Sequence, residues 1–217
     1  MSEVIAKVRR AHGSQNIGKL QNSRWLGTTN FVHQGLKGSY SILIGNSGQF
    51  YSRADLGEFG WIEIAISGNQ GWMDSSYQPK QELLADQIRS IQSLHPQVIY
   101  GDWTEEFESV EILDMETKND LEVYTVKLVN EGIPDRTVYV STETGLIVRL
   151  DTKELAPGIG NIPVTVRYED YRAVGGFKMP YRVISQNAFN GRWITTFDTV
   201  EANVDLPENA FTPISSR

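Results

Sequence analysis

The densest group of side chains that could carry out acid–base chemistry is a run of carboxylates near the middle of the chain. It comprises Glu105, Glu106, Glu108, Glu111, Asp114 and Glu116. Two carboxylates held close together can act as the acid and the base of a hydrolase. On the edge of a sheet the same residues are solvated, and their charge discourages pairing with another chain. We adopt the second interpretation as the simpler one.

The three histidines offer no metal site. His12, His33 and His95 each lack a second histidine or a carboxylate at the spacing of zinc ligands. The chain has no cysteine, which excludes thiolate ligands, disulfides and cysteine nucleophiles. The glycine-rich segments at 45–48 and 175–176 neither open a helix nor carry the Lys-Ser/Thr pair of a phosphate loop. We therefore predict no catalytic residue, no metal and no cofactor.

Composition narrows the class of partner. The 217 residues include 20 Lys and Arg and 27 Asp and Glu, which gives a net charge of −7 at pH 7. The basic residues are dispersed, with no run longer than Arg9-Arg10, and this argues against nucleic acid and against electrostatic docking on anionic lipid. No stretch approaches the ~20 apolar residues that span a bilayer. The N-terminal segment does not resemble a signal peptide, because charges lie inside its apolar part.

The C-terminal third has the most regular pattern. From residue 162 onwards, three long alternating runs are separated by tight turns at Gly175-Gly176 and Asn190-Gly191. One face of the first run carries Ile162, Val164, Val166 and Tyr168. Runs of this kind pair as antiparallel strands and leave one apolar face that another element must cover.

Residues 24–74 and 107–151 alternate in the same way, and one helical segment separates them. Pro79 suits the first helical position, His95-Pro96 ends the helix, and its apolar stripe consists of Leu83, Leu84, Ile88, Ile91 and Leu94. A shorter amphipathic helix is expected over residues 3–12. Strands before and after a helix, without regular alternation of the two, favour an α+β, mostly β fold. We predict a single domain over residues 1–217 with an antiparallel sheet of about eleven strands and two or three covering helices.

Aromatic residues are abundant, and many fall on the apolar side of the predicted strands. The chain has five Trp, nine Tyr and eight Phe. A sheet of about eleven strands must curl, and short helices can cover only part of its inner face. The sheet therefore either closes and fills its interior or leaves an apolar pocket. A pocket of this kind suits lipids and other apolar ligands.

Three segments of the chain carry a family resemblance. The first, SGNQGWMDSSYQPKQELLADQI at 67–88, has a turn, a tryptophan strand and a following helix, with matched residues Gly68, Gly71, Trp72, Asp74 and Tyr77. The others are TVYVSTETGLIVRLD at 137–151 and VRYEDYRAVGGFKMPYRV at 166–183. Together they resemble the outer-membrane lipoprotein-sorting carriers, the LolA/LolB-like proteins. The shared motifs are structural turns, so they indicate the fold more strongly than the function.

The resemblance implies a strongly curved, half-closed antiparallel barrel with helices as a lid over an apolar cavity. It implies a non-enzymatic module that binds or transports a lipid, an acyl chain or a lipoprotein in the periplasm or cell envelope, with a cytoplasmic location left open. A membrane-associated protein is a further partner in such a role, and we expect a monomer that binds no nucleic acid. The residues we expect to line the cavity are Trp25, Tyr40, Ile42, Phe50, Ile64, Trp72, Leu84, Ile88 and Ile91.

Two alternatives remain at this stage. The same fold with a filled core could serve as a sensory or protein-interaction module, possibly attached to a larger exported protein. An enzyme is the third hypothesis. A pocket that joins two carboxylates, or a histidine with a bound metal, would favour it.

Overall fold

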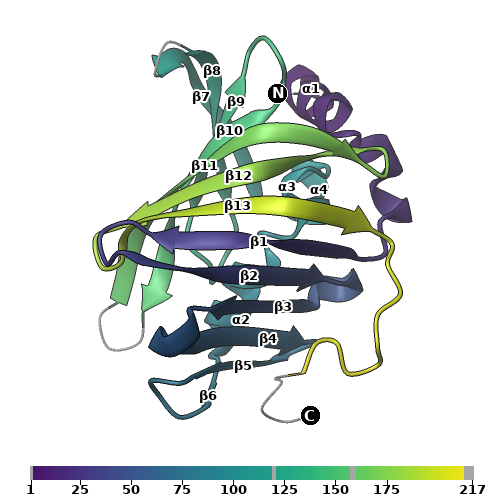
Figure 1. Ribbon diagram of the computed structural model, residues 1–217. Coiled ribbons are helices and arrows are strands. Elements are labelled where there is room, and N and C mark those ends of the chain that lie inside the picture. The colour runs from purple at the N-terminus through teal and green to yellow at the C-terminus, as the bar shows by residue number, and fades with distance from the viewer. Residues whose placement is uncertain (1, 119–120, 157–159, 213–217) are drawn as a thin grey trace.

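The strands of the protein form one curved, open sheet. The computed structural model describes residues 2–118, 121–156 and 160–212. Within these ranges, 13 strands pair antiparallel in the order β6-β5-β4-β3-β2-β1-β13-β12-β11-β10-β9-β8-β7 (Figure 1). The N-terminal strands are β1 Ser23–Phe31, β2 Leu36–Ile44, β3 Phe50–Asp55, β4 Trp61–Ser67, β5 Gln70–Ser75 and β6 Gln81–Glu82. The C-terminal strands are β7 Ser109–Lys118, β8 Leu121–Val129, β9 Arg136–Ser141, β10 Ile147–Ala156, β11 Gly160–Val174, β12 Phe177–Asn187 and β13 Gly191–Ala202.

Three of the helices lie on the connection between the two edges of the sheet. In the described chain the helices are α1 Ser2–His12, α2 Ala85–Gln92, α3 Pro96–Ile99 and α4 Trp103–Glu106, with short 3-10 turns at Ser14–Lys19, Asn46–Gly48 and Gly57–Phe59. The segment α2–α4 follows edge strand β6 and precedes edge strand β7, and Figure 1 shows all three helices behind the strands. The chain therefore crosses one face of the sheet, called here the inner face, between its two meanders. None of these helices is long and apolar enough to cross a membrane.

The predicted class of fold is confirmed, and two details of the prediction were wrong. The sheet has 13 strands rather than about eleven, and one of them, β6, is too short for any sequence pattern. The helix predicted from Pro79 begins only at Ala85, because Gln81 and Glu82 pair with β5 instead. The four-residue helices α3 and α4 were not predicted.

A glycine lets α2 lie directly on the sheet. The helix begins after Leu84, whose N–H donates a hydrogen bond to Gln87 Oε1 at 2.9 Å. A Cβ at Gly71 of β5 would lie 3.0 Å from Ile88 Cγ1 and 3.1 Å from Leu83 Cδ1. Such contacts are tighter than ordinary van der Waals packing, so a larger residue at position 71 would push α2 away from β5.

A second glycine fixes the end of α1. The helix buries Val4, Ile5, Val8 and His12. It ends at Gly13, which has φ +75°, and a Cβ there would lie 2.2 Å from the carbonyl oxygen of Gly176 in the turn between β11 and β12. Only glycine fits this approach, because the backbone of the turn has no side chain that could move aside.

The outer face of β3–β5 is also covered. Tyr51 and Ala65 pack with Ala210 and Phe211 of the C-terminal segment, and Leu43, Trp72 and Leu206 border this cluster. Glu63, with a fully buried side chain, accepts hydrogen bonds at 3.1 Å from Tyr51 and from Arg53. Both faces of these strands are therefore partly covered, the inner one by α2 and the outer one by the C-terminal segment.

Candidate ligand-binding site

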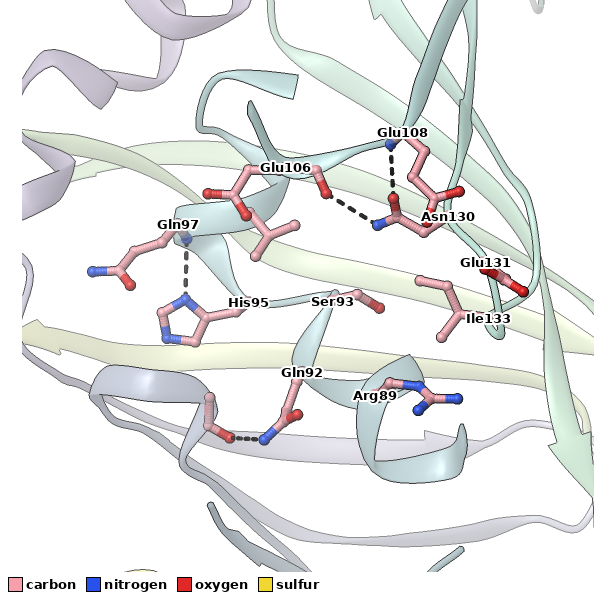
Figure 2. Close-up of a pocket in the computed structure, with 12 residues that line it drawn as sticks. Arg89, Gln92, Ser93, His95, Gln97, Glu106, Glu108, Asn130, Glu131 and Ile133 are labelled. Atoms are coloured by element: carbon pink, nitrogen blue, oxygen red, sulfur yellow. Dashed lines mark hydrogen bonds between the residues drawn. The ribbon is translucent and has the colours of Figure 1, made fainter. Parts of the chain in front are cut away.

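A polar hollow of about 580 Å³ opens between α2, α4 and the loop after β8 (Figure 2). Its polar groups are largely engaged with each other or with the backbone. Asn130 accepts a hydrogen bond from the Glu108 N–H at 2.8 Å and donates one to the Glu106 carbonyl at 3.0 Å. Gln92 donates to the carbonyls of Gly48 and Gly68 at 3.3 and 3.0 Å. These bonds hold the walls of the hollow together.

His95 is the one histidine of this hollow, and both of its ring nitrogens are used. Nε2–H donates to the Gly45 carbonyl at 2.9 Å, and Nδ1 accepts from the Gln97 N–H at 3.1 Å. Burial lowers the pKa of His95, which favours this neutral form. The residue therefore caps α3 and ties it to the loop after β2. No group of three His, Cys, Asp or Glu residues in the described chain could hold a metal ion.

The carboxylate run divides between two elements. Glu105 and Glu106 belong to α4, whereas Glu111 and Asp114 are exposed on β7. β7 is an edge strand of the sheet, as the solvated-edge interpretation requires. Acidic side chains on such an edge oppose pairing with another strand.

Three apolar cavities lie on the inner face. The central cavity, of about 210 Å³, is lined by Trp25, Tyr40, Ile42, Ile44, Leu94, Pro96, Ile99, Tyr100, Tyr168, Pro180, Val183, Ser185, Trp193, Thr195 and Phe197. The middle cavity, of about 200 Å³, is lined by Tyr40, Ile44, Gly48, Gln49, Phe50, Ser52, Ile64, Ile91, Gln92, Leu94 and His95. The end cavity, of about 260 Å³, is lined by Ile64, Met73, Leu83, Gln87, Ser90, Ile91, Glu154, Ile162, Asn187, Phe189 and Asn190.

The three cavities form a row. The central and middle cavities share Tyr40, Ile44 and Leu94, and the middle and end cavities share Ile64 and Ile91. Each alone is smaller than the roughly 300–1,000 Å³ of a typical ligand pocket, and the three together fall within that range. The row follows from strand alternation, which sends every second residue of β2 to β5 to the inner face.

Six of the nine residues expected to line a cavity border this row. Trp25, Tyr40 and Ile42 line the central cavity, Phe50 the middle cavity, and Ile64 and Ile91 both the middle and end cavities. Ile88 is only 4% exposed and packs at Gly71.

The remaining two lie elsewhere. Trp72 packs at the outer cluster beside Tyr51 and Ala65. It neighbours Met73, and successive residues of a strand point to opposite faces, so Met73 lines the end cavity in its place. Leu84 is 66% exposed and precedes the first turn of α2.

Sequence reasoning missed the contribution of the C-terminal strands to the cavities. Ile162 of β11 lines the end cavity and Tyr168 the central one, and Val183 of β12 joins Tyr168 there. Ile162 and Tyr168 belong to the apolar face that alternation predicted for the first C-terminal run. The missing step was that this face lies opposite β2–β5 across the curve of the sheet.

The inner face is tightly packed at the α1 end. The His12 ring stacks on Tyr100 with centroids 4.1 Å apart and meets the edge of Tyr171. His12 Nε2 accepts from the Ile147 N–H at 3.2 Å, and Nδ1 lies 3.3 Å from the Lys178 carbonyl, to which it donates. Burial lowers the pKa of His12 to about 4, so the ring is neutral at pH 7.

Comparisons with known proteins agree on the architecture. No family model matches the chain, and no curated protein does either. A DUF1329 family protein from Desulfovibrio piger superposes with a TM-score of 0.63 at 13% identity, covering 99% of this chain and 98% of that one. A LolA superfamily protein from Nitrosomonas europaea gives 0.59 at 15% identity, covering 98% and 97%.

The chain has the LolA-like fold. A domain from Vibrio parahaemolyticus described as an outer membrane lipoprotein-sorting protein also superposes on it, with a TM-score of 0.56 at 10% identity, covering 88% of this chain and 89% of that one. Identities this low show the fold alone. The LolA-like resemblance expected from the turn motifs is confirmed, and what this chain binds must be argued from its own cavities.

Proposed function

We propose that this protein binds a lipid, an acyl chain or the acyl part of a lipoprotein in the row of inner cavities, without catalysing a reaction. The observation that carries the proposal is the row itself, which consists of three adjoining cavities with mostly apolar walls beneath α2, α3 and the turn between them. Each methylene group that moves from water into such a cavity contributes roughly 0.8 kcal/mol. An acyl chain therefore binds without charged partners or covalent chemistry.

The setting we propose follows the structural neighbours. One of them is described as an outer membrane lipoprotein-sorting protein, so a periplasmic or cell-envelope location suits the proposed role. Residues 1–217 would act as one binding domain and as a monomer, with α2 as the element that must move for a guest to enter. A membrane-associated protein partner would deliver or receive the guest. The alternative of an interaction module with a filled core fits less well, because the described core leaves these cavities open.

Dye binding tests the proposal. We expect the neutral apolar dye N-phenyl-1-naphthylamine to bind saturably at about one equivalent and to be displaced by long-chain lipids. Ile91→Trp and Ile64→Trp each fill space shared by the middle and end cavities, and each should abolish most of the binding.

Thr199→Trp is the matched control, because it adds the same ring at an exposed position of β13. It should leave dye binding unchanged. Absence of saturable binding to the wild-type protein, or equal binding by all three tryptophan variants, would contradict the proposed function.

A further inference from the structure

Arg136 is a buried cation on the inner face of the sheet. It begins β9, alternates with the fully buried Val138 and Val140, and is itself only 1% exposed. Its Nη2 donates to the Ser90 carbonyl at 3.3 Å and to Ser93 Oγ, both in or directly after α2. On its other side the guanidinium carbon lies 5.9 Å from the ring centroid of Phe107.

The guanidinium lacks a counter-charge. Its Nε and Nη1 are buried and have no hydrogen-bond partner, and no carboxylate of the described chain forms an ion pair with it. Arg9, Arg24, Arg53 and Arg182, in contrast, each contact an Asp or Glu. Burial lowers the pKa of Arg136 to about 10, so the group is still charged at neutral pH. A lone buried charge with unmade hydrogen bonds is expensive, and an oxyanion is the natural partner of a guanidinium.

The surroundings of Arg136 place this charge among the inner cavities. Its partner Ser90 lines the end cavity, and its partner Ser93 lines the polar hollow. Tyr168, which lines the central cavity, is close enough to interact with it electrostatically. Arg136 itself stays behind these walls, one side chain away from the space that a guest of the cavities would occupy.

We propose that Arg136 binds the acidic head of a single-chain amphiphile whose hydrocarbon tail occupies the inner cavities. The head is a carboxylate, as in a fatty acid, or a phosphate, as in a lysophospholipid. Because Nε–H and Nη1–H point to different edges of the guanidinium, the head would accept from one of them while Nη2 keeps its bonds to α2. This inference rests on the proposed function, and it narrows the guest from any acyl chain to an acidic one.

Competition among matched ligands tests the inference. The displacement of the neutral dye from wild-type protein at pH 8 is compared for four ligands: hexadecanoic acid, 1-palmitoyl lysophosphatidic acid, hexadecanol and methyl hexadecanoate. We expect at least one of the two acidic ligands to displace the dye at a concentration at least tenfold lower than the alcohol and the ester require. The relative strength of the two acids identifies the source of the oxyanion.

Variants at Arg136 separate recognition from packing. Arg136→Met keeps the length of the side chain and should remove the advantage of the acids over the alcohol, measured as the ratio of their displacing concentrations. Arg136→Lys should keep part of the preference. Arg167→Met is the control, because Arg167 is an exposed arginine that does not line these cavities.

A spectroscopic measurement makes the test independent of whether the variants fold. Hexadecanoic acid labelled with ¹³C at its carboxyl group should, when bound to wild-type protein, remain ionised to a pH well below that of the free acid. If neither acid displaces the dye better than the alcohol, the inference is overturned while the proposed function stays intact. The same holds if hexadecanoic acid is the stronger of the two acids but its bound carboxyl protonates like the free acid. A uniform loss of all ligands in Arg136→Met would also overturn the inference. Failure of the dye itself to bind would instead remove the proposed function.

Discussion

The two ends of the inner face are built from the same alternating strands and are filled to different degrees. At the α1 end, Val8, Trp103, Val138, Val140 and Met179 have no exposed surface. At the α2 end, Tyr40, Ile42, Ile64 and Met73 are only half-buried and border cavities. The difference lies in the covering elements. Helices α1, α3 and α4 pack together at the first end, whereas α2, the turn after it and one side of α3 cover the second. Within α2 only Ile88 and Ile91 are large apolar residues, which is too little to fill the space above four strands.

Truncating an isoleucine at each end gives the largest expected contrast. Ile147 is 1% exposed in the packed end, and Ile64 lines two cavities in the other. Truncating a buried isoleucine to alanine destabilises a protein by roughly 2–5 kcal/mol, and the loss rises with the volume of the cavity left behind. We expect the loss of unfolding free energy to lie near the top of that range for Ile147→Ala and near or below its lower limit for Ile64→Ala. Urea unfolding of both variants measures the contrast, and equal losses would mean that the two ends are packed alike.

Acid should destabilise the packed end through His12. Its pKa is about 4 in the folded protein and about 6.5 in an unfolded chain. Between those values the unfolded state binds a proton that the folded state does not, so stability is lost as pH falls from about 6.5 towards 4. The loss from this group is about 3 kcal/mol, and below pH 4 it contributes no further change.

Variants isolate this contribution from that of the carboxylates. His12→Phe should be less stable at pH 7, because the Ile147 N–H and the Lys178 carbonyl lose their partner, and its stability should fall less between pH 6.5 and 4 than that of the wild type. His33→Gln, at an exposed position, should keep the wild-type slope. An unchanged slope in His12→Phe would show that the buried imidazole does not control acid unfolding.

Adding one methylene group gives the smallest contrast. Val138 has no exposed surface in the packed end, whereas Val183 is half-buried and lines the central cavity. Overpacking a full core costs roughly 1–3 kcal/mol. We expect that cost for Val138→Ile and a change within about 0.5 kcal/mol for Val183→Ile. The melting temperatures of the two variants measure this contrast. A large drop in the melting temperature of Val183→Ile would mean that the central cavity has no room for an added carbon.

Sequence periodicity predicted those parts of the fold that depend on neighbouring residues. Alternation placed Tyr40, Ile42 and Ile64 on the inner face, because a side-chain period of two is a local property of any strand. Alternation alone could not choose between Trp72 and Met73, since the C-terminal segment buries the outer face of β5 and makes both positions apolar. It also could not place the start of α2, which depends on the pairing of Gln81 and Glu82 with β5.

The burial of Arg136 could have been predicted from the sequence pattern. Arg136 stands two residues before Val138 and four before Val140 in RTVYV, so alternation alone assigns it to the apolar face. A charged residue in phase with a buried row is unusual, because few arginines are fully buried without a partner. The pattern could not predict the absence of a nearby carboxylate, because that depends on how α2 and α4 pack against β9.

The pairing of β1 with β13 has a consequence for how the chain reaches its native state. Every other neighbouring pair of strands in the sheet is also adjacent in the chain, whereas Thr29 and Thr195, in contact across this seam, are 166 residues apart. Closing so long a loop carries an entropic cost that precedes any gain from the contacts formed. During ribosomal synthesis the free edge of β1 must therefore wait until β13 has emerged. Throughout that interval it is a template for mispairing with other nascent chains.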